Sequence, residues 1–274
     1  GLLIFDECHH LPSMYYRKVA ECSVSWMRMG LTATPERSDG LHTYLRELIG
    51  DVVYRLSPRE LSKGGYIAEY SIERHYVNLS EEEEEEYKRL MDGYNDYVRG
   101  MFPSYDPRRA FELVVMRSRR DPSAHRALLC REKARKIALN ARKKIEFLEK
   151  LLKKYRKKKV IIFSRYNSIV KEISYKFLIP KITHETPEEE RRMLIEEFRK
   201  GNLTKIVTGE VLDEGVDVPD ASVGIIISGT GSERQLIQRL GRILRPKDER
   251  ATLIELVTRS TIDRSLSFRR RPKD

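Results

Sequence analysis

Short apolar runs alternate with polar stretches of helical period through the last part of the chain, from about residue 145 to residue 258. Runs of strand length lie at 160–163, 181–183, 205–208, 224–228 and 251–258. Short apolar runs bounded by turn signals are typical of buried strands, and strands that alternate with helices indicate a parallel, doubly wound sheet. The pattern therefore predicts an α/β fold for this segment.

Two more apolar runs lie in the first segment, up to about residue 57, and each leads into a polar cluster. LLIF at 2–5 is followed by DECHH, and MRMGL at 27–31 is followed by TATP. The first run has the composition of a buried strand. Because ligands of α/β sheets bind at the carboxyl ends of the strands, both polar clusters are candidate site segments.

The middle segment, about 80 to 135, is charged and has helical period. Ser80 and Glu83 have the spacing of a capping box at the start of the acidic run 81–86. An apolar stripe follows on one helical face and breaks at MFPSYDP, where the prolines end the helix. A long basic helix is then predicted from about Ser123. Its apolar seam comprises Ala134, Ala138, Ala141, Ile145, Leu148 and Leu152.

Charge distribution adds a candidate partner. Lys and Arg outnumber Asp and Glu by 53 to 42, a formal charge of +11, and residues 126–159 alone carry 15 Lys and Arg against 3 Asp and Glu. Such a balance favours nucleic acid as a partner, with a solvated basic surface as the alternative. Arg142 and Lys143 lie off the apolar seam, and we expect them to contact DNA phosphates.

Cysteine spacing and hydropathy exclude several classes of protein. Cys8, Cys22 and Cys130 are scattered along the chain, so neither a disulfide framework nor a zinc ribbon is expected. No apolar run approaches the ~18 residues of a membrane-spanning helix, and no membrane partner is expected.

The carboxylates that follow the first strand are candidates for metal-dependent chemistry. Asp6 there can hold Mg²⁺ beside a nucleotide, while Glu7 orients or deprotonates water. A pair of acidic residues after a strand is also a common structural cap, so the pair by itself is weak support. His9 and His10 lack the spacing of a helical zinc site.

Several motifs together carry a family resemblance. DECH at 6–9, TATP at 32–35, IIFSRY at 161–166, TGEVLDEGVDVP at 208–219 and QRLGRILRP at 238–246 follow one another in this order. The array resembles motifs II to VI of superfamily 2 helicases. The longer strings LTATPERSDG and VLDEGVDVPDASVGIIISGTGSERQLIQRLGRILRP resemble the XPB family of DNA repair and transcription motors, and most of all its short archaeal members.

The resemblance implies roles for individual residues. Asp6 would coordinate Mg²⁺, Glu7 would act on the attacking water, and His9 would couple nucleotide state to the other lobe. The remaining implied roles are coupling of hydrolysis to DNA movement by Thr32 and Thr34, nucleotide or phosphate contact by Gly215 and Asp217, an arginine finger at Arg242 or Arg245 positioned by Gln238, and DNA contact by Ser164 and Arg165.

The resemblance also implies a domain organisation. The expected parts are the rear of a first RecA-like lobe at 1–57, a linker and first strand of a second lobe at 58–79, a helical thumb-like insertion at 80–135, the second RecA-like lobe at 136–258 and a basic tail at 259–274. A GxxxxGK[ST] phosphate loop is missing from the sequence. Since that loop precedes the DExH strand in these motors, we expect the C-terminal half of a helicase, cut inside its first lobe.

The function that the resemblance implies is ATP-dependent 3′–5′ DNA helicase or translocase activity in nucleotide excision repair or promoter opening. The alternatives are a non-catalytic DNA-binding or scaffold module and another superfamily 2 translocase. The expected cofactors are ATP and Mg²⁺. Expected partners are DNA, the N-terminal half of the same motor and a nuclease or a repair or transcription factor bound through the thumb. The location would be cytoplasmic in an archaeon or nuclear in a eukaryote.

Overall fold

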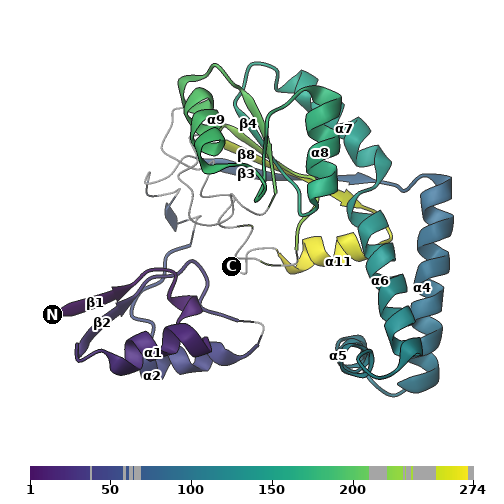
Figure 1. The fold of residues 1–274 in the computed structure, drawn as a ribbon. Coiled ribbons are helices and arrows are strands. Elements are labelled where there is room, and N and C mark those ends of the chain that lie inside the picture. The colour runs from purple at the N-terminus through teal and green to yellow at the C-terminus, as the bar shows by residue number, and fades with distance from the viewer. Residues whose placement is uncertain are drawn as a thin grey trace.

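The computed structural model of this chain describes residues 1–37, 39–57, 60–61, 64, 69–209, 221–230, 232, 236 and 251–270. It has two parallel sheets, one of two strands and one of six. A helical arm extends from the larger sheet (Figure 1). The α/β class predicted from the alternating pattern is confirmed.

The small sheet pairs β1 (Leu2–Phe5) with β2 (Met27–Gly30) in parallel. Around it lie η1 (Cys8–His10), α1 (Met14–Cys22), η2 (Leu41–Thr43) and α2 (Tyr44–Leu48). The helices cover one face, where Cys8, Leu11, Ala20, Leu45 and Leu48 form the core.

The prediction that the first strand is buried is wrong for one of its faces. Leu2 is 56% exposed and Ile4 is 53% exposed. Side chains alternate between the two faces of a strand, and α1 and α2 pack against only one face of this sheet. Met27 and Met29 of β2 are exposed as well, and in the described part of the chain no helix covers these side chains.

The large sheet has the strand order β3-β8-β7-β4-β6-β5, and all its pairings are parallel. Its strands are β3 (Tyr70–Val77), β4 (Val160–Phe163), β5 (Lys181–Ile182), β6 (Lys205–Thr208), β7 (Val223–Ile226) and β8 (Ala251–Thr258). The five strand-length runs of the last segment are thus strands, with ends that differ from the predicted ones at β5 and β7.

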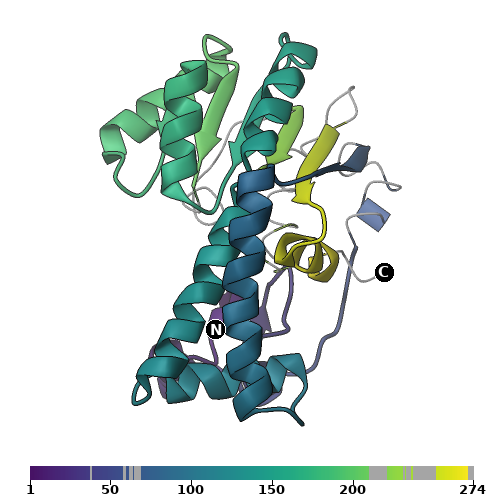
Figure 2. The ribbon, with the colours of Figure 1, turned by 90° about the vertical axis from the view of Figure 1, so that its right-hand side faces the viewer.

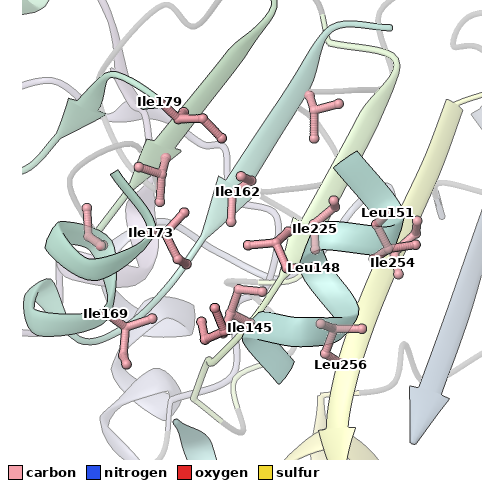
Figure 3. Close-up of a cluster of buried hydrophobic side chains, with 14 of the residues drawn as sticks. Ile145, Leu148, Leu151, Ile162, Ile169, Ile173, Ile179, Ile225, Ile254 and Leu256 are labelled. Carbon is pink, nitrogen blue, oxygen red and sulfur yellow. The ribbon is translucent and has the colours of Figure 1, made fainter. Parts of the chain in front are cut away.

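Helices cover both faces of this sheet, as a parallel sheet requires. On one face α7 (Arg142–Lys154) and α8 (Asn167–Phe177) enclose a core that includes Leu148, Ile162 and Ile173 (Figure 3). On the other, α9 (Glu188–Lys200) buries Phe198 against Ile161 and Phe163. Successive side chains of β4 therefore pack into the cores on opposite faces of the sheet.

The helical arm consists of α4 (Glu81–Met101), α5 (Pro107–Arg117) and α6 (Pro122–Leu139). α4 runs out from the sheet and α6 returns beside it (Figure 2). The Ser80 capping box is confirmed, because the Ser80 hydroxyl accepts from the Glu83 N–H and the Glu83 carboxylate accepts from the Ser80 N–H. Tyr94, Phe102 and Val114 lie in the core of the arm.

The single long basic helix predicted from Ser123 is wrong, because the chain forms two helices, α6 and α7. Helix α6 passes the expected domain boundary at residue 135 and ends at Leu139, and Ala141 then adopts extended ψ. Side chains from elsewhere bind the last α6 carbonyls, with Thr258 Oγ1 donating to Ala138 and Lys144 Nζ donating to Leu139. These bonds replace those that a continuing helix would make. The predicted apolar seam ended with Leu152, but the buried residue at this end is Leu151, and Leu152 is only partly buried.

The last described helix is α11 (Ile262–Arg269), which follows β8. Thr261 caps its start by accepting from the Asp263 N–H. No helix among the described residues is both long enough and apolar enough to span a membrane.

Candidate functional site

The two polar clusters of the first segment meet at the carboxyl edge of the small sheet. Phe5, at the end of β1, pairs with Gly30, at the end of β2. Beyond the strands, Leu31 N donates to Phe5 O at 2.9 Å and Cys8 N donates to Leu31 O at 2.9 Å. These backbone bonds join the DECH segment to the TATP segment, as the shared strand direction predicts.

Asp6 and Glu7 make the turn out of β1. Glu7 has left-handed backbone angles of φ 46° and ψ 46°, and its N–H donates to Asp6 Oδ1 at 2.9 Å. A non-glycine residue in this region is uncommon and points to a local constraint that is often functional. The Asp6 side chain is exposed, while the Glu7 side chain is half-buried.

The residues at this turn fit a Mg²⁺ ion but not an all-protein metal cage. Mg²⁺ is commonly held by one or two carboxylates together with waters and substrate phosphates, and the exposed Asp6 carboxylate suits that arrangement. No group of three His, Cys, Asp or Glu side chains suitable for a metal exists among the residues described.

His9 connects the acidic turn to the TATP segment. Its side chain is fully buried, and Nδ1 lies 2.9 Å from Thr32 Oγ1 and 3.2 Å from Glu7 Oε2. The Thr32 hydroxyl donates to Thr34 O at 3.1 Å, so it accepts from His9, which places the proton on Nδ1. Glu7, His9, Thr32 and Thr34 therefore form one continuous set of contacts.

Arg37 is a further member of this site that sequence reasoning missed. Its NH1 donates to the His9 carbonyl at 2.7 Å, and its NH2 lies 2.6 Å from Asp39 Oδ2. Hydrogen bonding to Arg37 lowers the pKa of Asp39 to about 2, and the same bond raises the pKa of Arg37. Arg37 contacts His9, which lies 28 residues earlier in the chain, so local sequence patterns do not reveal the contact. The only sequence signal was the position of Arg37 directly after TATPE.

The large sheet places the predicted DNA contacts Ser164 and Arg165 at the end of β4. Ser164 is buried, with its hydroxyl 3.0 Å from Ser228 Oγ, and the Arg165 N–H donates to the same Ser228 oxygen at 3.0 Å. The Ser164 hydroxyl thus faces Ser228, and its contact with DNA stays a prediction. The Arg165 side chain is partly exposed, and its role stays a prediction.

The basic stretch is less uniformly exposed than its charge count suggested. Arg142 is exposed and lies 3.0 Å from Glu82 in the first turn of α4. Lys143 Nζ donates at 3.2 Å to the carbonyl of Leu79, the residue before the N-cap of α4. Lys144, by contrast, is fully buried, and Arg131 is mostly buried over the Phe111 ring. Part of the stretch therefore holds the fold together and cannot face phosphates.

The remaining predicted site residues lie outside the residues that the structure describes, and their roles stay predictions. They are Gly215, Asp217, Gln238, Arg242 and Arg245.

Comparisons with known proteins place these motifs in a family. Residues 143–247 match the model of the helicase conserved C-terminal domain, and residues 1–37 match that of the type III restriction enzyme, res subunit. Among solved structures, the Hef helicase domain of Pyrococcus furiosus aligns with a TM-score of 0.56 at 19% identity, over 98% of this chain and 74% of that one. That similarity supports the RecA-like helicase fold.

Two curated relatives are similar over most of this chain. The DNA 3′-5′ translocase XPB2 of Sulfurisphaera tokodaii is 45% identical over 98% of this chain and 61% of its own length. The general transcription and DNA repair factor IIH helicase/translocase subunit XPB1 of Arabidopsis thaliana is 31% identical over 90% of this chain and 28% of its own length. The chain thus spans about three fifths of the first relative and less of the second, and it belongs to the XPB family of superfamily 2 helicases.

Proposed function

We propose that this chain is the part of an ATP-driven DNA 3′–5′ translocase or helicase that begins at the DExH motif. The names of the Sulfurisphaera and Arabidopsis relatives support a DNA 3′-5′ translocase or helicase activity and a role in transcription and DNA repair. The observation that carries the proposal is the set of contacts from Glu7 through His9 to Thr32 and Thr34, because it joins a hydrolytic carboxylate to the segment after the neighbouring strand.

The side chains of the small sheet have distinct tasks in this proposal. Glu7 accepts a proton from the attacking water, and Asp6 holds Mg²⁺, which neutralises charge on the nucleotide phosphates when bound. His9 contacts both the Glu7 carboxylate and the Thr32 hydroxyl, so a shift of Glu7 would change the position of Thr32. Arg37 holds the His9 backbone in place through the carbonyl bond.

The second lobe supplies the groups that complete the nucleotide site in this proposal. Arg242 and Arg245 stabilise the charge that develops on the transferring phosphoryl group, and Gln238 helps to position them. Gly215 and Asp217 shape the loop after β6 and contact nucleotide or backbone phosphate.

A direct test compares full-length protein that carries the Gly-rich phosphate loop with the 274-residue chain. We expect DNA-stimulated ATP hydrolysis and 3′–5′ movement from the full-length protein. The 274-residue chain should show no DNA-stimulated ATPase, yet bind DNA at low salt. DNA binding without ATP turnover by the full-length protein would instead support the scaffold alternative, and stimulation by RNA alone would support another superfamily 2 motor.

The salt dependence of DNA binding tests the basic stretch. Replacing Arg142 and Lys143 with alanine should reduce the slope of log affinity against log salt by about 0.9 for each duplex phosphate that is no longer neutralised. The matched control replaces Arg199 and Lys200 with alanine, which removes the same charge from α9 on the opposite face of the sheet. The control should keep the wild-type slope. A wild-type slope in the Arg142 and Lys143 variant as well would show that these two residues do not contact DNA phosphates and serve only to hold the start of α7 beside the start of the arm.

We also propose two protein partners. The N-terminal portion of the same motor would cover the exposed face of β1 and β2, where Leu2, Ile4, Met27 and Met29 lie. A basic nuclease or a repair or transcription factor would bind the thumb through the acidic start of α4, where Glu82 and Glu83 already bond Arg142.

An archaeal motor of this type would act in the cytoplasm, and a eukaryotic one in the nucleus.

A further inference from the structure

A buried network of charged side chains lies where the helical arm meets the large sheet. Among the described residues it joins Lys144 of α7, Glu255 of β8, Asp263 of α11, Arg270 just after α11, and Arg74 of β3. Lys144, Glu255 and Asp263 have no exposed side-chain surface, and Arg270 is nearly as buried. The network lies away from the acidic turn of β1, and none of the roles assigned above uses it.

Lys144 binds the first part of the network. Its ammonium group donates to Asp263 Oδ2 at 2.7 Å, to Ile227 O at 2.7 Å and to Leu139 O at 3.2 Å. Burial lowers the pKa of Lys144, and the Asp263 carboxylate opposes that effect. Asp263 Oδ2 also accepts from the Thr258 N–H at 2.8 Å, so a single carboxylate oxygen holds α7 and the end of β8 together.

Arg270 binds the second part. Its guanidinium pairs with Glu255 Oε1, lies 3.5 Å from Asp263 Oδ1 and donates through NH1 to Thr230 O at 3.1 Å. The other Glu255 oxygen accepts from Arg74 Nε and from Ser267 Oγ, each at 2.9 Å. Glu255 is therefore held from β3 and α11 at once.

The two buried cations converge on one backbone segment. Lys144 binds the carbonyl of Ile227, and Arg270 binds the carbonyl of Thr230. Between them, Ser228 Oγ contacts Ser164 Oγ and accepts the Arg165 N–H from the end of β4. Residues 227–230 are thus held from the arm side and from the β4 side. In the sequence, this segment precedes Gln238, Arg242 and Arg245.

Stability alone does not require such a network. Replacing a buried ion pair with well-packed apolar side chains is often neutral or stabilising, whereas charged groups specify one geometry. Hydrogen bonds from cations to carbonyl oxygens are directional and strong. A network that directs two cations at one segment therefore fixes the position of that backbone more tightly than an apolar contact would.

We propose that Lys144, Asp263 and Arg270 are positioning residues that fix residues 227–230, and through them the approach of the arginine-finger segment, relative to the base of the helical arm. The proposal rests on the proposed function for its effect on catalysis. The position of the 227–230 backbone itself is independent of that function. Loss of the network should misplace the fingers and leave the ATP-binding residues of the first lobe unaltered.

Arg270→Lys is the sharpest variant, because a lysine keeps a cation near Glu255 and Asp263 but lacks the planar fork that reaches Thr230. In the full-length protein it should lower kcat roughly 10- to 100-fold, the cost of about 1 Å of misplacement. The affinity for ADP with aluminium fluoride should fall in parallel, while ATP affinity stays within about twofold. Arg264→Lys, at an exposed position of α11, is the matched control and should match the wild type.

Hydrogen exchange tests the same inference without relying on activity. In Arg270→Lys, peptides that span residues 227–230 should exchange about tenfold faster, while β4 and β6 keep their protection. Unchanged exchange there, or a folded variant with wild-type kcat, would overturn the proposal. A lower melting temperature with unaltered kcat per folded molecule would also overturn it, because the role would then be structural. Wild-type protein without ATP turnover would contradict the proposed function, and the exchange result would still decide the positioning role.

Discussion

Arg245→Ala in the full-length protein should lower ATP turnover by roughly 10³-fold or more, the scale of a lost arginine finger. In the proposed role, the guanidinium would stabilise charge that develops on the phosphoryl group only as the bond to the leaving oxygen breaks. ATP binding in the ground state should therefore change far less than kcat. The measurement is steady-state ATPase activity at saturating DNA, together with the equilibrium binding of a non-hydrolysable ATP analogue.

Two further variants make this result specific. Arg245→Lys keeps the charge but loses the planar fork, so most of the loss should remain. Arg264→Ala removes an exposed arginine of α11 and should leave turnover unaltered. Normal kcat in Arg245→Ala would exclude Arg245 as the finger and leave Arg242 to be tested in the same assay.

Glu7→Gln should abolish most of the DNA-stimulated turnover, by about 10²- to 10⁴-fold, because glutamine cannot accept the proton of the attacking water. The substitution preserves the shape of the side chain, and it leaves the His9–Thr32 bond unaltered. ATP and DNA should consequently still bind, and the variant should accumulate in the ATP-bound state. Single-turnover hydrolysis and ATP affinity, measured on the same preparation, separate the chemical step from binding.

Glu47→Gln is the matched control for this variant, since Glu47 is an exposed carboxylate on α2 of the same small sheet unit. It should retain wild-type turnover. Full activity in Glu7→Gln would remove Glu7 from the chemical step and leave its contact with His9 as its only role.

Much of the fold followed from local patterns in the sequence. The runs at 160–163, 205–208 and 251–258 are strands within the bounds that their apolar composition predicts. The Ser80 capping box begins α4 as its spacing predicts. These features depend on side chains within a few residues of one another, so hydrophobic period and capping chemistry are sufficient to recognise them.

The candidate site was predicted in part. The motif order identified Asp6, Glu7, His9, Thr32 and Thr34, and parallel strands bring their segments to one edge of the small sheet. The contact of Arg37 with the His9 carbonyl was not predicted, because a backbone acceptor leaves no mark in the sequence. Ser164 matched a motif position, yet its hydroxyl faces Ser228 inside the protein.

Sequence by itself determined the α/β class, most strand positions, the helix start at Ser80 and the family, all of which depend on short windows of residues. Only the tertiary structure decided which basic residues are on the surface. Lys144 lies in a run of cations that resembles a phosphate-binding helix face, but its partner Asp263 is 119 residues further along the chain. A long-range contact also helps to end α6 at Leu139, because the Thr258 hydroxyl, from a residue 120 positions further along the chain, donates to the carbonyl of Ala138. A buried charge is stable only beside its partner, and that partner is set by how the sheet and helices pack.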